Sequence, residues 1–121
     1  MKTIIMLILL LVSTITFAQQ PIIYQYNNVE RTDINTNNKD YAKAIFNITI
    51  DPVTDILSIH SGTDIIKFRI QPQTYKTDVI NNQQTVIFDM INIDTGNTNN
   101  VLMQGTDIYM LENNYLFKFN N

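Results

Sequence analysis

Residues 56–68 read ILSIHSGTDIIKF, with apolar residues recurring at every second position on both sides of a single glycine. Gly62-Thr63 fits a two-residue hairpin loop, because glycine at the first loop position readily adopts the positive φ of a type II′ turn. The pairs predicted from this loop are Ser61 with Asp64, Ile59 with Ile66 and Leu57 with Phe68. Apolar side chains then meet on one face, so the stretch predicts an antiparallel hairpin with one buried side.

The same stretch contains His60, the only histidine of the chain, beside serine and aspartate residues that are typical of a nucleophilic hydrolase site. A catalytic triad is assembled from residues distant in the sequence, and neighbouring residues of a strand point to opposite sides of a sheet. His60 is therefore expected to point outward, while Ser61 closes the turn. The sequence predicts no catalytic residue and no enzymatic activity. A small hydrolase would require His60 or Asp89 in a cleft beside a second polar group.

Most of the chain beyond residue 21 repeats this two-residue periodicity, and helical spacing is hard to find. A second hairpin is predicted around Asn113-Asn114 as a type I′ turn, because asparagine tolerates positive φ. Its predicted pairs are Met110 with Phe117 and Ile108 with Phe119. The expected strands are Ile22–Tyr26, Tyr41–Ile50, Ile56–Ser61, Ile65–Gln71, Tyr75–Ile80, Gln84–Ile93, Val101–Gln104, Ile108–Glu112 and Tyr115–Phe119. Consecutive hairpins predict an all-β antiparallel meander, either a small up-and-down barrel or a two-layer sandwich.

Two parts of the chain interrupt this pattern. The apolar phase slips between Met90 and Ile91, which predicts a β-bulge there or a strand covered on both faces. Asp89 is expected to face outward, because its neighbours Phe88 and Met90 are expected to face inward. The polar segment Asn27 to Asp40 has no apolar periodicity, and it is expected to be a long loop that is either functional or mobile.

The first 18 residues are expected to be a cleavable signal peptide. Lys2 supplies a positive n-region, Ile4 to Val12 form an unbroken apolar run, and Ala18 fits the small residue before a cleavage site. The run is shorter than the roughly 20 apolar residues that a membrane-spanning helix needs. We expect an exported protein, periplasmic or secreted, in which residues 19–121 form a single domain with no stable membrane insertion after cleavage.

The chain has no cysteine and a formal net charge of −3. Disulfides, thiol nucleophiles and thiolate metal sites are therefore excluded. The segment Asp94 to Asn99 is rich in aspartate and asparagine, but it lacks the ligand spacing and the distal glutamate of an EF-hand loop. No metal or cofactor is predicted. Because Arg31 and Arg69 are the only arginines and no basic cluster is present, we expect no nucleic-acid partner.

The tyrosines near the expected mature N-terminus are the best candidates for a binding surface, since tyrosine offers a large contact area with few rotatable bonds. The candidate binding residues are Tyr24, Tyr26, Arg31 and Tyr41. Alternatively, these tyrosines are sheet rim residues that reflect β-propensity. The sequence predicts a non-catalytic binding or structural protein with an unidentified protein or glycan partner. The alternative function is a barrel that carries an apolar small molecule, which requires a cavity of roughly a few hundred Å³.

Overall fold

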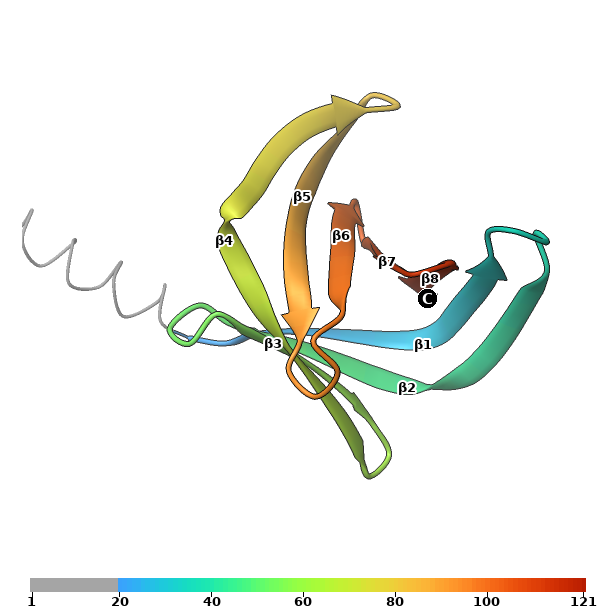
Figure 1. Cartoon of the computed structure of the whole chain (residues 1–121), viewed down its shortest axis with the longest axis horizontal. Coiled ribbons are helices and arrows are strands. Elements are labelled where there is room, and N and C mark those ends of the chain that lie inside the picture. Colours follow the sequence, from blue (N-terminus) through green and yellow to red (C-terminus); the bar gives the residue numbers. More distant parts are fainter. Residues whose placement is uncertain (1–19) are drawn as a thin grey trace, which may run out of the picture.

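The structure is a computed structural model, and it describes residues 20–121. These residues form eight antiparallel strands that close into a barrel, in which each strand pairs with the next and β1 also pairs with β8 (Figure 1). The strands are β1 (Ile22–Asp33), β2 (Lys39–Asp51), β3 (Ile56–Ser61), β4 (Asp64–Ile80), β5 (Gln83–Asn92), β6 (Thr98–Gln104), β7 (Asp107–Glu112) and β8 (Tyr115–Asn120). The all-β prediction is confirmed, and the barrel is the architecture formed. The signal peptide predicted for residues 1–18 lies outside the described residues.

The hairpin of β3 and β4 has the predicted register, with all three predicted pairs present. Gly62 has a φ of +60°, and Thr63 is not among the residues with positive φ, as expected for a type II′ turn. The two-residue loop therefore sets the pairing of both strands.

The hairpin of β7 and β8 also has the predicted register, but its turn differs from the prediction. A type I′ turn needs positive φ at both loop residues, whereas Asn113 (φ 54°) has it and Asn114 does not. Asn81 (φ 53°) and Asn82 (φ 64°), between β4 and β5, both have positive φ. The type I′ pattern thus belongs to the β4–β5 hairpin.

The prediction of a long loop from Asn27 to Asp40 is wrong, because most of this segment belongs to β1 and β2. The end of β1 pairs with the start of β2 on one side and with β8 on the other. These pairings satisfy the backbone hydrogen bonds of the segment, although its sequence lacks apolar periodicity. Two ion pairs join the hairpin, between Arg31 and Asp40 (2.7 Å) and between Lys39 and Glu30 (3.1 Å). These strand ends have charged side chains where apolar residues at every second position would predict a strand.

The two strands predicted at residues 65–71 and 75–80 are one bent strand, β4 (Figure 1). Its pairing with β5 shifts between Gln71 and Lys76. Thr74 bridges this irregularity, because its hydroxyl accepts the Asp89 N–H at 2.8 Å and donates to the Gln71 carbonyl at 2.6 Å. The predicted β-bulge at Met90 is wrong, since β5 pairs without a break with β6 at that point. Instead apolar residues occur on both faces of β5 without a bulge, with Met90 fully buried inside and Ile91 half-buried outside.

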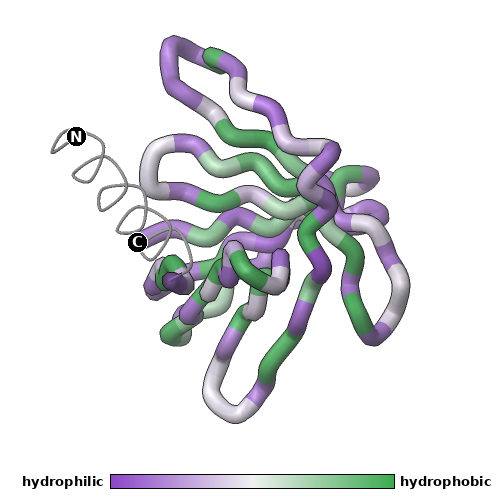
Figure 2. Tube along the Cα trace, turned by 90° about the vertical axis from the view of Figure 1, so that its left-hand side faces the viewer, coloured by the Kyte–Doolittle hydropathy of each residue, from purple (hydrophilic) through white to green (hydrophobic). Residues whose placement is uncertain are grey.

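The inward-facing side chains form one core within the barrel. Figure 2 shows apolar and hydrophilic residues alternating along the strands, with hydrophilic residues at many of the hairpin loops. The buried apolar residues are Tyr26, Ile48, Leu57, Ile59, Phe68, Phe88, Met90, Val101, Ile108, Met110 and Phe119. The Phe119 ring contacts the rings of Phe46 and Tyr26, with centroids 5.7 and 6.1 Å away. Aromatic packing therefore joins β8 to β1 and β2 where the barrel closes.

Candidate functional site

The candidate residues Tyr24 and Tyr26 point into the barrel. Tyr26 is 2% exposed and packs against Phe119, and Tyr24 is half-buried against the same core. Burial of the Tyr26 hydroxyl, followed by the effects of Tyr24 and Asp107, raises the pKa of Tyr26 to about 12. The Tyr26 side chain is therefore a core group and is not available to a partner at the outer surface.

The other two candidates, Arg31 and Tyr41, lie on opposite faces of the β1–β2 hairpin. Arg31 pairs with Phe117 of β8, whose side chain faces inward, and its guanidinium lies 5.1 Å from the Tyr115 ring centroid. The hydrogen bond that Arg31 donates to the Asp40 carboxylate raises the pKa of Arg31 above its ordinary value. Tyr41 is exposed and pairs with Glu30, so it belongs to the alternate face. The structure does not bring the four candidate residues into one surface.

A cavity of about 270 Å³ lies inside the barrel, at the end that carries the β3–β4 and β7–β8 turns. Its wall is mostly aromatic and aliphatic, with side chains from every strand except β5. The lining residues are Val29, Phe46, Ile59, Ser61, Asp64, Ile66, Phe68, Asn99, Met110, Glu112, Phe117 and Phe119. Ile66 is on the inward face, opposite Ile59, yet it is 43% exposed. Because Ile66 faces inward and is still exposed to solvent, it lies at the mouth of the cavity.

The polar groups of the cavity are few and give its mouth a negative character. Asp64 is exposed and Glu112 is half-buried, and the Glu112 carboxylate accepts a hydrogen bond from Asn97 Nδ2 at 3.2 Å. Asn99, which is 2% exposed, donates from Nδ2 to the Asn97 carbonyl at 3.5 Å. This contact is longer than the usual 2.7 to 3.2 Å or so of an N–H···O bond, so the Asn99 amide is only weakly engaged.

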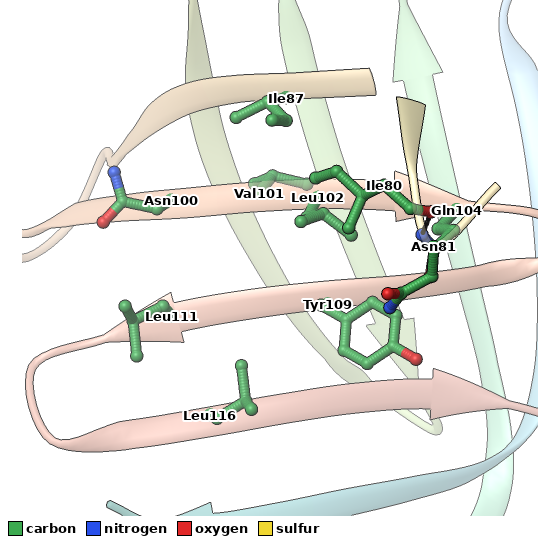
Figure 3. A pocket seen from close by; sticks show the side chains of 10 residues that line it. All are labelled: Ile80, Asn81, Ile87, Asn100, Val101, Leu102, Gln104, Tyr109, Leu111 and Leu116. Atoms are coloured by element: carbon green, nitrogen blue, oxygen red, sulfur yellow. Dashed lines mark hydrogen bonds between the residues drawn. The ribbon is translucent and has the colours of Figure 1, made fainter. Parts of the chain in front are cut away.

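A second hollow, of about 440 Å³, lies on the outside of the barrel. Figure 3 shows its floor, made by Leu102, Leu111 and Leu116 on the outer face of β6, β7 and β8, with Ile80 of β4 lying across it. Gln104 holds this hairpin end in place, because its Nε2 donates to the Ile80 carbonyl at 3.0 Å and to Thr85 Oγ1 at 3.1 Å. The outer hollow has a larger volume than the inner cavity, but it lies on the outside of the barrel.

Neither hollow could be placed from the sequence. The alternation identifies Ile66, Phe68 and Met110 as inward residues, but an inward residue either packs or lines a space. Only the closure of the barrel decides between these outcomes, and closure depends on pairing between strands at the two ends of the domain. Ile66 is the residue that could have indicated the inner cavity, since the predicted register places it inward next to the exposed turn.

The two residues considered for hydrolysis face outward. His60 lies opposite Asn47 and Ile65 on the outer side of β3. Asp89 faces outward as predicted, and it accepts a hydrogen bond from Asn100 Nδ2 at 2.6 Å.

Within residues 20–121, no group of three His, Cys, Asp or Glu side chains could hold a metal ion. The same part of the chain has no helix long and apolar enough to cross a membrane. No protein-family model, curated protein or solved structure matches the chain.

Proposed function

We propose that the protein is a non-catalytic binding protein whose barrel takes up a small, largely apolar molecule through the mouth beside Ile66. The observation that carries this proposal is the open apolar cavity bounded by an inward but 43% exposed isoleucine. The mouths of β-barrels are common ligand sites, and a barrel of this size either fills with side chains or holds one small ligand. The backbone N–H and C=O groups of the wall are occupied by the strand ladders, so the wall favours apolar contact.

The cavity volume limits the size of the ligand. A protein cavity of about 150 Å³ holds benzene, whereas drug-sized ligands occupy sites of roughly 300 to 1,000 Å³. At about 270 Å³, the cavity suits a molecule larger than one aromatic ring and smaller than most drugs. A fused two-ring aromatic compound or a short acyl chain meets this limit.

The charges at the mouth limit the polar end of the ligand. Asp64 and Glu112 place negative side chains at the opening, and the positive charge of Arg31 is matched by Asp40. A ligand with a neutral or positive polar group is therefore favoured over an anion of the same shape. Asn99, whose own hydrogen bond is long, is the side chain best able to bond that polar group.

The test is an NMR titration of the ¹⁵N-labelled protein with 2-naphthol, 2-naphthylmethylamine and 2-naphthoate, which share one ring system. We expect amide shifts around Ile66, Met110 and Phe117 with the neutral and cationic compounds, and about tenfold weaker binding of the anion. Shifts that cluster instead at Leu102 and Leu111 would place binding in the outer hollow and contradict the proposal. The absence of saturable shifts with all three compounds would contradict it as well.

A further inference from the structure

One edge of β4 has no neighbouring strand over much of its length. β3 pairs with β4 only from Asp64 to Arg69, whereas β5 pairs with it up to Ile80. Among the described strands, β4 contacts only β3 and β5, and Figure 1 shows its distal half flanked by β5 alone. Residues 75–79 are all exposed, and their apolar members Tyr75 and Val79 are 58% and 57% exposed.

The backbone groups on this free edge can be identified from the hairpin turn. Ile80 and Gln83 flank a two-residue loop, so they exchange both of their hydrogen bonds across the hairpin. Bonds to β5 then recur at every second residue, which leaves the N–H and C=O groups of Tyr75, Thr77 and Val79 on the free edge. The Val79 N–H agrees with this assignment, because it donates to Asp78 Oδ1 at 2.7 Å.

We propose that a second copy of this chain pairs with the free edge, antiparallel and about a two-fold axis through Thr77. The sequence YKTDV at residues 75–79 is its own complement in that register. Lys76 of each copy lies opposite Asp78 of the other, and Tyr75 lies opposite Val79. Opposite charges, aromatic with β-branched residues, and threonine with threonine are all favourable cross-strand pairs. In the same register, the free backbone N–H and C=O groups of residues 75, 77 and 79 bond to those of the second copy.

Charge selects this register over its neighbours. A two-fold axis perpendicular to a sheet places one residue of each strand opposite its own equivalent. An axis through Lys76 or Asp78 would set like charges against each other, which is unfavourable. With the axis at Thr77, Lys76 and Asp78 occupy a non-hydrogen-bonded pair, where facing side chains lie closest. Asp78 must leave the Val79 N–H to reach Lys76 of the second copy, and that N–H then bonds the opposing strand.

The other free edges carry features that oppose pairing. The first part of β1 follows Pro21, and its edge is capped by Asn121, whose side chain bonds the Gln25 carbonyl (3.2 Å) and the Asn27 N–H (3.0 Å). The first part of β2 is unpaired on its β3 side, but its register with β1 shifts near Ala44. Proline, caps and bulges are the usual means by which proteins block edge pairing. Residues 76–79 contain no proline and pair with β5 without a register shift, and their one cap is the Asp78 carboxylate on the Val79 N–H. Tyr75 lies at the end of the β4 irregularity.

The test is the mass of the purified protein by sedimentation velocity, compared with charge variants of the edge. We expect a dimer for the natural sequence, and a dimer about tenfold weaker for Lys76→Asp and for Asp78→Lys, since each sets like charges opposite. The double variant Lys76→Asp with Asp78→Lys restores the pair and is expected to dimerise again. Lys43→Asp, the same charge change on the β2 edge, is the matched control and should leave the dimer intact.

A cysteine variant measures the register directly, because the natural chain has no cysteine. Facing residues of a hydrogen-bonded pair have Cα atoms about 5.5 Å apart, within the range of about 4.4 to 6.8 Å that a disulfide spans. Thr77→Cys should therefore form a covalent dimer on mild oxidation faster than Thr63→Cys, which lies in the exposed β3–β4 loop.

Four outcomes would overturn the proposal. One is a natural protein that stays monomeric at millimolar concentration. Another is a dimer that resists both single charge reversals, which would place the interface elsewhere. The third is a double variant that is folded by circular dichroism but monomeric. The fourth is a Thr77→Cys protein that crosslinks no faster than the Thr63→Cys control.

Discussion

Gly62 lies at the point where a single residue determines the pairing of two strands. Its φ of +60° falls in the left-handed region, and an added Cβ would meet no atom within 4 Å. A substitution there is therefore opposed by backbone strain alone, without a steric clash. Since the β3–β4 register carries Ile66 to the cavity mouth, the backbone of this residue affects the site as well as the fold.

Gly62→Val is expected to lower the free energy of unfolding by about 2 kcal/mol, because a β-branched residue is strained at positive φ. Gly62→Asn should cost less than half as much, since asparagine tolerates this conformation. Urea unfolding followed by circular dichroism measures both variants. Equal stability of the valine variant and the natural protein would contradict the assigned turn.

Tyr26 gives the core a dependence on alkaline pH. Its folded-state pKa of about 12 lies above the ordinary value of 10.0, so folding favours the protonated hydroxyl. The associated stability is fully present below pH 10 and is lost as the pH rises toward 12. Tyr26→Phe should remove this component, so the melting temperature of the natural protein should fall relative to that of the variant between those pH values. A constant difference in melting temperature from pH 9 to 12 would show that Tyr26 does not titrate as assigned.

At the scale of strands, β4 depends on Thr74 to pass its irregularity opposite β5. The Thr74 hydroxyl bonds both the Asp89 N–H and the Gln71 carbonyl, in place of the backbone partners of a regular strand pair. Thr74→Ala should destabilise the protein by about 1 to 2 kcal/mol, because it leaves a partly buried N–H without an acceptor. Thr74→Ser keeps the hydroxyl and serves as the control in chemical denaturation. If alanine and serine variants are equally stable, the bridge contributes nothing to β4.

The sequence allowed the strand registers to be predicted only where a short loop joins two strands. Two-residue loops at Gly62 and Asn113 fix the pairing by counting, and both registers are confirmed. The prediction of a loop from Asn27 to Asp40 is wrong because ion pairs and pairing with β8 support strands that lack apolar alternation. The pattern predicts a break between residues 71 and 75, but it does not predict that β4 continues across it, because this depends on the hydrogen bond between Thr74 and β5. Turns between adjacent strands could be predicted from the sequence, whereas contacts between distant segments could not.

At the scale of the molecule, closure between β1 and β8 creates the enclosed space. An open sandwich and a barrel share the same hairpins, so the sequence pattern predicts both architectures equally well. Closure sets Val29 of β1 opposite Phe119 of β8, and both residues line the inner cavity. Without this closure, the sequence pattern alone predicts a binding surface at the candidate tyrosines. Once the barrel closes, Tyr24 and Tyr26 face its interior.

The central claim is that the inner cavity is the ligand site, and two neighbouring isoleucines test it. Ile66 faces the cavity mouth, whereas Ile65 is exposed on the outer face of the same strand. Ile66→Trp should fill the mouth and weaken 2-naphthol binding at least about tenfold, while Ile65→Trp leaves the affinity within about twofold of the natural protein. The measurement is the dissociation constant of 2-naphthol for each folded variant. Equal affinities of the two tryptophan variants would contradict the account.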